Sequence, residues 1–140
     1  DDEGKELPVK RIYDRFIQRY VEQPEGRLHY VEHVTRIEGD RTSRVVEATI
    51  VDAGQEVQIS GRGTGAIDGF MDAIGRHIGR SISVADYSEH SLQRGSNASA
   101  IAYMEIEEDG RRAFGGGIDQ NATTASLKAI VAAVNRMLAD

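Results

Sequence analysis

Two glycine-rich segments, each placed just before a helical pattern, constrain the fold of this chain more than any other feature. The first is Gly61-Arg62-Gly63-Thr64-Gly65 and the second begins Gly115-Gly116-Gly117. After each segment apolar residues recur at three- and four-residue spacing, which predicts an amphipathic helix. Where the helices begin, Gly65-Ala66-Ile67-Asp68 resembles Gly116-Gly117-Ile118-Asp119, about half a domain further along. This repetition predicts a duplicated unit.

Three strand patterns precede each predicted helix. They are short, rich in β-branched residues and separated by turn signals such as Asp109-Gly110. The predicted strands are Leu28–Ile37, Ser43–Val51, Gln55–Ser60, Ser81–Tyr87, Ala98–Ile106 and Arg112–Gly115. We therefore predict an α+β fold of two βββα units, about 26–80 and 81–140, whose antiparallel sheets carry helices on one face.

The first 25 residues form a separate pattern. Between Pro8 and Val21 the apolar residues follow the spacing of one helix face, and Pro8 suits a first helical turn. Gln23-Pro24-Glu25-Gly26 then breaks the pattern. We predict an N-terminal arm or linker helix in residues 1–25 and a single domain in residues 26–140.

Composition excludes several classes of protein. The chain has 39% hydrophobic and 29% charged residues, and no apolar run approaches the roughly 20 residues of a membrane helix. A net charge of −6 argues against binding to the phosphates of nucleic acid. With no cysteine, disulfides and thiol chemistry are excluded. Since the first residues also lack a signal-peptide pattern, we expect a cytoplasmic protein that binds neither nucleic acid nor membrane.

The first glycine-rich segment favours anion binding. Glycines before a helix leave backbone N–H groups unobstructed at the positive end of the helix dipole. No Gly-Lys-Ser/Thr follows, so a nucleotide-phosphate loop is disfavoured, whereas a carboxylate fits. The alternative is that these glycines only permit tight turns.

One predicted strand has an unusually small face, which carries Ala98, Ala100 and Ala102. Small residues leave room, either for a packed helix or for a small apolar ligand side chain. Combined with an anion-binding helix start, this face suggests a ligand with a carboxylate and an aliphatic tail, such as a branched-chain amino or keto acid.

Catalytic motifs are scarce. Tyr87-Ser88-Glu89-His90 is the only compact titratable group, and solvated surface is its simpler interpretation. His33 and His77 lack metal-ligand spacing, and no G-x-S-x-G motif occurs. We expect no catalytic residue, metal site or cofactor in this domain.

Four motifs resemble, in order and approximate spacing, the regulatory domain of 2-isopropylmalate synthases. They are Gly61–Phe70, Val84–His90, Gly115–Ile118 and Thr123–Arg136. The similarity covers residues 26 to 138, and the opening helix resembles the linker of that family. It implies a homodimeric domain that binds L-leucine and inhibits a catalytic barrel condensing acetyl-CoA with 2-oxoisovalerate. The barrel, with its divalent metal, is absent from these residues, so the isolated domain is not expected to be an enzyme.

The resemblance also implies an effector site. Carried over by position, it comprises Gly63, Thr64, Gly65, Ile67, Asp68, Tyr87, Ser91, Ala98, Ala100, Ile118 and Asp119. We hypothesise that helix-start N–H groups bind the effector carboxylate, alanines and isoleucines receive its side chain, and Asp68 or Asp119 pairs with its ammonium.

Some positions depart from the family pattern. Ala66, Thr64, Gly116, Asp119 and Ser91 stand where proline, asparagine, valine and small or apolar residues are usual. A charge at Asp119 beside an aliphatic pocket is costly unless it is paired or faces solvent. Two alternatives therefore stay open: a citramalate-synthase-type domain that binds isoleucine, and a structural dimerisation module without a ligand.

Overall fold

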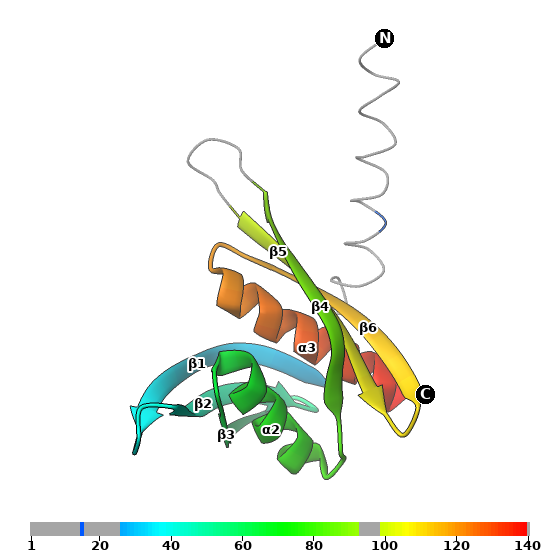
Figure 1. The fold of residues 1–140 in the computed structure, drawn as a ribbon. Helices are drawn as coiled ribbons and strands as arrows, with labels where there is room; N and C mark the ends of the chain where they lie inside the picture. Colours follow the sequence, from blue (N-terminus) through cyan, green and yellow to red (C-terminus); the bar gives the residue numbers. More distant parts are fainter. Residues whose placement is uncertain (1–14, 16–25, 93–98, 140) are drawn as a thin grey trace.

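The structure, a computed structural model, describes residues 15, 26–92 and 99–139 (Figure 1). The predicted arm helix and Ala98 lie outside these residues. The elements run β1 (Leu28–Glu38), β2 (Ser43–Asp52), β3 (Gln55–Gly63), α2 (Ala66–Ile78), β4 (Ser83–Leu92), β5 (Ser99–Glu108), β6 (Arg111–Asp119) and α3 (Ala122–Ala139). The strands form two antiparallel sheets, β1-β2-β3 and β4-β5-β6, each followed by a helix. This confirms the predicted α+β fold of two βββα units.

The duplication extends to local irregularities. The first strand of each sheet has a bulge, between Tyr30 and Glu32 in β1 and between Val84 and Asp86 in β4. The turn between the second and third strands has positive φ angles at both central positions, at Ala53-Gly54 and again at Asp109-Gly110. Such turns match the twist of a tight hairpin. The two units therefore share a backbone plan, although few of their side chains are identical.

The glycine-rich segments differ from their predicted role as helix-start loops. Gly61 and Gly63 belong to β3, and Gly115 to Gly117 belong to β6, so both strands are longer than predicted. A Cβ on Gly61 would lie 2.2 Å from the Gly69 carbonyl oxygen, and one on Gly115 would lie 2.2 Å from the Ala133 amide nitrogen. Because the helix backbones pack this closely on the strands, only glycine fits there.

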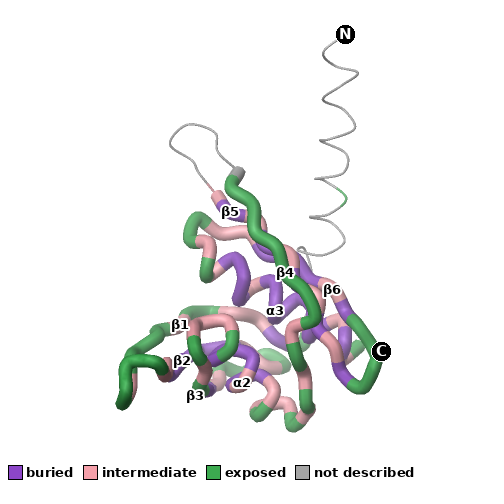
Figure 2. Tube along the Cα trace, viewed as in Figure 1, coloured by how far each residue is buried: buried purple, intermediate pink, exposed green. Residues whose placement is uncertain are grey.

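Helix α3 is the centre of the molecule. It packs on β5 and β6 of its own unit and also contacts β1 and α2 of the other. Figure 2 shows α3 almost wholly buried, whereas β4 is exposed along its length. Leu28, Phe70, Met104, Leu127 and Ile130 are fully buried, so one core joins the two units. No helix within the described residues is long and apolar enough to span a membrane.

Candidate functional site

The start of α2 is open. Its N-cap residue Gly65 has an extended backbone, and no side chain makes a capping hydrogen bond there. A Cβ on Gly65 would meet no described atom within 4 Å. Asp68 lies in the first turn, but its carboxylate accepts a hydrogen bond from the Thr64 hydroxyl at 2.6 Å. Since the first N–H groups of a helix have no partner within it, this end offers free donors and a positive dipole end.

Two other predicted residues near this helix start, Gly63 and Ile67, have structural roles. A Cβ on Gly63 would lie 2.4 Å from the Asp68 Cβ, so Gly63 allows β3 to approach the helix. Ile67 is half-buried and packs against the core. Of the five predicted residues on this segment, Thr64 and Asp68 are exposed, and Gly65 borders open space.

A groove adjoins this helix start. It has a volume of about 660 Å³ and runs from Asp68 past Met71 and Ile82 to Val84, between α2 and the beginning of β4. Figure 1 shows these two elements beside each other. The lining combines apolar side chains with charged ones, which suits a small amphipathic molecule.

A second group of predicted residues lies on the sheet β4-β5-β6. The register places Ser91 opposite Ala100 and Ala100 opposite Asp119, so the three lie in one row across the sheet. Ala100 is buried in the core with the α3 side chains. Tyr87 lies further along the same face of β4 and is 52% exposed. Ile118 pairs with Ile101 and therefore faces the opposite side of the sheet.

The start of α3 is closed, unlike that of α2. The Asn121 side chain accepts the Thr124 N–H at 2.9 Å, as an N-cap residue does. Asp119 accepts the Asn121 N–H at 2.8 Å and forms an ion pair with Lys128 at 3.1 Å. The Asn121 N–H and then Lys128 lower the pKa of Asp119. The charge at Asp119 is thus paired within the chain.

Tyr30 connects the two helix starts, and sequence analysis did not single it out. Its ring centroid lies 6.3 Å from that of Phe70 of α2, and its hydroxyl makes a hydrogen bond with His33 Nδ1 at 2.7 Å. Burial raises the pKa of Tyr30, to which the charge of Asp119 adds, and burial lowers the pKa of His33. Thr124 of α3 lies close enough to the Tyr30 hydroxyl to lower its pKa in part. An inward-facing tyrosine needs a partner for its hydroxyl, which is the signal that sequence analysis had available.

Glu89 and His90, the titratable neighbours in β4, do not form a catalytic pair. Glu89 faces α3 and accepts a long hydrogen bond of 3.5 Å from Ser126, whereas its neighbour His90 pairs with Ile101 on the other face. Adjacent residues of a strand point to opposite sides of a sheet. Among the described residues no cluster of histidine and carboxylate groups could hold a metal ion.

The fold and the site together define a duplicated βββα domain in which one helix start is open to solvent and the other is capped. The chain belongs to the LeuA allosteric (dimerisation) domain family, which matches residues 6–138. The resemblance noted from the sequence is thereby confirmed.

Similar proteins agree with this membership, since they are 2-isopropylmalate synthases. The chain is 57% identical over 139 residues to a 2-isopropylmalate synthase of Rhizobium meliloti and 55% identical over 139 residues to that of Mesorhizobium japonicum, with 99% of the chain and 25% of each relative covered. It is 38% identical over 138 residues to that of Mycobacterium leprae, with 99% of the chain and 23% of the relative covered. The chain thus spans about a quarter of the length of these enzymes.

Proposed function

We propose that this chain is the C-terminal regulatory part of a 2-isopropylmalate synthase, and that it binds L-leucine to inhibit the enzyme that makes the precursor of leucine. The start of α2 is uncapped at Gly65, and a groove of about 660 Å³ begins in the same helical turn, at Asp68. Membership in an allosteric domain family supports a regulatory rather than a catalytic role for this opening.

In this proposal the α2 start binds the carboxylate of the amino acid. Helix-start N–H groups donate hydrogen bonds to anions, and the dipole adds a favourable charge interaction. The ammonium group is assigned to Asp68, because Asp119 already has Lys128 as its partner. The aliphatic side chain would then extend along the groove toward Met71 and Val84.

We further propose that the domain acts as a homodimer. Among the described residues, the large hydrophobic side chains that remain exposed lie on two of the four edge strands: Val31, Val34 and Ile37 on β1, and Tyr87 on β4. Exposed apolar residues on unpaired edges favour association with another chain. A second copy is the occupant that the family description, a dimerisation domain, supports.

Structural dimerisation without a ligand is the second candidate, and one observation favours it. Gly61, Gly63, Gly115 and Gly117 all allow a helix to pack closely on a strand, so these glycines need no ligand to explain them. Binding of isoleucine in place of leucine is the third, because the groove favours an aliphatic side chain without specifying its branching.

Thermal unfolding in the presence of amino acids separates these candidates. L-leucine at 100 times its dissociation constant should stabilise the native state by about 2.7 kcal/mol and raise Tm, whereas D-leucine should not. A larger shift with L-isoleucine would indicate the citramalate-synthase-type function. If no branched-chain amino acid shifts Tm at millimolar concentration while light scattering gives a dimer, the structural candidate is correct.

The substitution Gly65→Asp tests the site itself. Aspartate at an N-cap accepts the free N–H groups and should raise stability by a few tenths of a kcal/mol relative to glycine. It should also weaken L-leucine binding at least tenfold in calorimetry, because the new carboxylate occupies the place of the ligand's. Gln55→Glu, at the exposed start of β3, adds the same charge elsewhere and should bind normally. Unchanged binding by Gly65→Asp would exclude this helix start as the site.

A further inference from the structure

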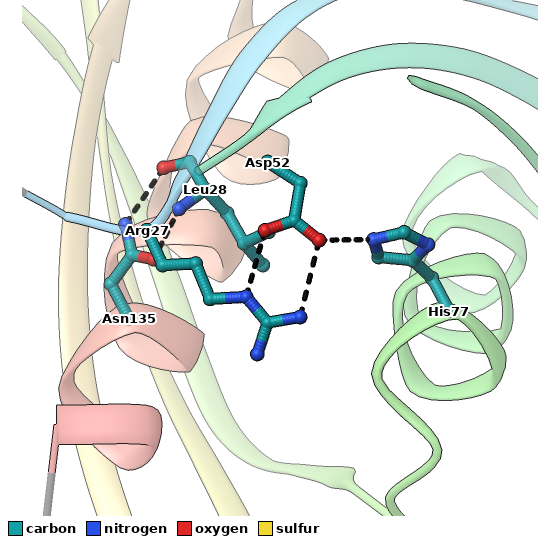
Figure 3. Close-up of polar contacts among 5 residues, drawn as sticks. All are labelled: Arg27, Leu28, Asp52, His77 and Asn135. Carbon is teal, nitrogen blue, oxygen red and sulfur yellow. Dashed lines mark hydrogen bonds and ion pairs between the residues drawn. The ribbon is translucent and has the colours of Figure 1, made fainter. Parts of the chain in front are cut away.

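The point where the chain enters the domain is held by α3. Asn135, on α3, accepts the Leu28 N–H through Oδ1 at 2.8 Å and donates from Nδ2 to the Leu28 carbonyl, also at 2.8 Å (Figure 3). Asn135 is 8% exposed and Leu28 is fully buried. A Cβ on Gly26 would lie 2.4 Å from Asn135 Nδ2, so any side chain there would displace the Asn135 amide from this contact. The contact joins residues 107 positions apart.

Arg27, which lies between Gly26 and Leu28, is held by the first unit. The Arg27 guanidinium donates to both carboxylate oxygens of Asp52, at 2.7 and 3.1 Å. His77 Nε2, near the end of α2, lies 2.7 Å from Asp52 Oδ2. Figure 3 shows Asp52 between Arg27 and His77. The Arg27 carbonyl also accepts the Ala53 N–H at 2.9 Å.

The corresponding acid of the second unit is bound differently. Glu108 precedes the Asp109-Gly110 turn as Asp52 precedes Ala53-Gly54. Its partners are Arg80, between α2 and β4, and Arg111, at the start of β6. The link from the acid to a helix side chain, through His77, is therefore particular to the unit where the chain enters.

Residues 26–28 are thus hydrogen-bonded to α3 and, through Asp52, connected to α2. We infer that this segment, which we name the junction, transmits a movement between the two units to the chain that precedes it, with Asn135 and Arg27 as its positioning residues. The inference rests on the proposed regulatory function. If an effector shifts α2 relative to α3, residues 26–28 cannot keep both sets of contacts, because each set is directional.

The test uses the full-length synthase that contains this chain, with L-leucine binding and inhibition measured separately. In Asn135→Leu and in Arg27→Gln, calorimetry should give a dissociation constant within threefold of the wild type. Inhibition at saturating L-leucine should fall to less than half of the wild-type value. Arg27 is 46% exposed, so Arg27→Gln should retain the fold. Unchanged inhibition, or a loss of inhibition fully accounted for by weaker binding, would overturn the inference.

Matched controls separate coupling from stability. Thr49→Val removes a part-buried side-chain hydrogen bond to Gln58, away from the junction. Arg112→Gln breaks an ion pair with Glu105 whose side chains are 56% and 12% exposed, close to the 46% and 13% of Arg27 and Asp52. Both controls should keep wild-type binding and inhibition.

A double-mutant cycle tests the junction without any effector. His77→Ala and Asn135→Leu alter residues whose described contacts do not touch each other, so independent sites would give additive changes in the unfolding midpoint. Coupling through residues 26–28 predicts a clear departure from additivity, and additivity would overturn the inference. Wild-type protein that binds no L-leucine would instead refute the proposed function, and this cycle would still decide on the junction.

Discussion

The two units share one backbone plan but treat their helix starts in opposite ways. In the first, Gly65 precedes α2 and leaves the first N–H groups facing open space. In the second, Asn121 caps α3 and Asp119 is occupied by Asn121 and Lys128. The duplicated fold thus contains two similar helix starts, and a few side chains decide which of them keeps its first N–H groups free of a side-chain cap.

The helices also differ in what surrounds them. α2 buries one side, with Phe70 and Ile74 turned to the core, whereas α3 is buried along most of its length. A helix that borders solvent can move or bind without disturbing a second layer, but α3 is packed against both units. The open start and the solvent-facing side thus belong to the same helix.

The largest expected effect on stability concerns the close packing of a helix on a glycine of the strand, which both units share. Gly115→Ala would place a Cβ 2.2 Å from the Ala133 amide nitrogen and should destabilise the protein by about 3 kcal/mol in urea unfolding. Gly61→Ala, which meets the Gly69 carbonyl oxygen at the same 2.2 Å, should cost a similar amount. Gly65→Ser should not destabilise. If Gly115→Ala were as stable as the wild type, the close packing in the second unit would be refuted.

The next effect concerns the acids before the two turns. The hydrogen bonds from Arg27 are the main cause that lowers the pKa of Asp52 from its usual 3.8 to about 2. Those from Arg80 are the main cause that lowers the pKa of Glu108 from its usual 4.5 to about 2. A lowered carboxyl pKa stabilises the folded state above the unfolded pKa, and that stability is lost as pH falls through about 4 toward 2.

Asp52→Asn should therefore cost about 2 kcal/mol at pH 7, and the difference from the wild type should shrink on acidification to pH 2. Chemical unfolding at several pH values measures it. Glu108→Gln should show the same pH dependence. A difference that stayed constant from pH 7 to pH 2 would contradict the role of the ionised Asp52.

The smallest effect concerns the caps. Asn121→Ala removes the side-chain acceptor for the Thr124 N–H and should lower stability by about 1 kcal/mol. The amides of the first turn of α3 should then exchange hydrogen faster, approaching the rate at the start of α2. Equal protection of the two helix starts in the wild type would remove the contrast between the units.

Much of the fold could be predicted because its signals are local. Alternation in β5 and the Asp109-Gly110 turn each depend on a few neighbouring residues. The ends of β3 and β6 could not be predicted, because glycine weakens a strand unless a helix packs on it, and that contact is tertiary. The sequence interpretation therefore left Gly61, Gly63, Gly116 and Gly117 outside the strands, and ended the last strand at Gly115.

The candidate site was less predictable for the same reason. Gly65 and Asp68 follow from a helix-start pattern; the structure leaves open space at Gly65 and places Asp68 in the lining of the groove. The contacts of Tyr30 with Phe70 and Thr124 join elements that are distant in sequence, so no local pattern announces them. The pairing of Asp119 with Lys128 depends on how β6 meets α3 and was likewise not foreseen.

The contact between Leu28 and Asn135 also has a consequence for how the protein folds. The buried Leu28 backbone obtains these partners only after the ribosome has added 107 more residues. A nascent first unit therefore carries an unsatisfied strand end, and its core stays incomplete until α3 docks. Such long-range closure slows folding. The two halves, despite their likeness, should fold as one cooperative body rather than one after the other.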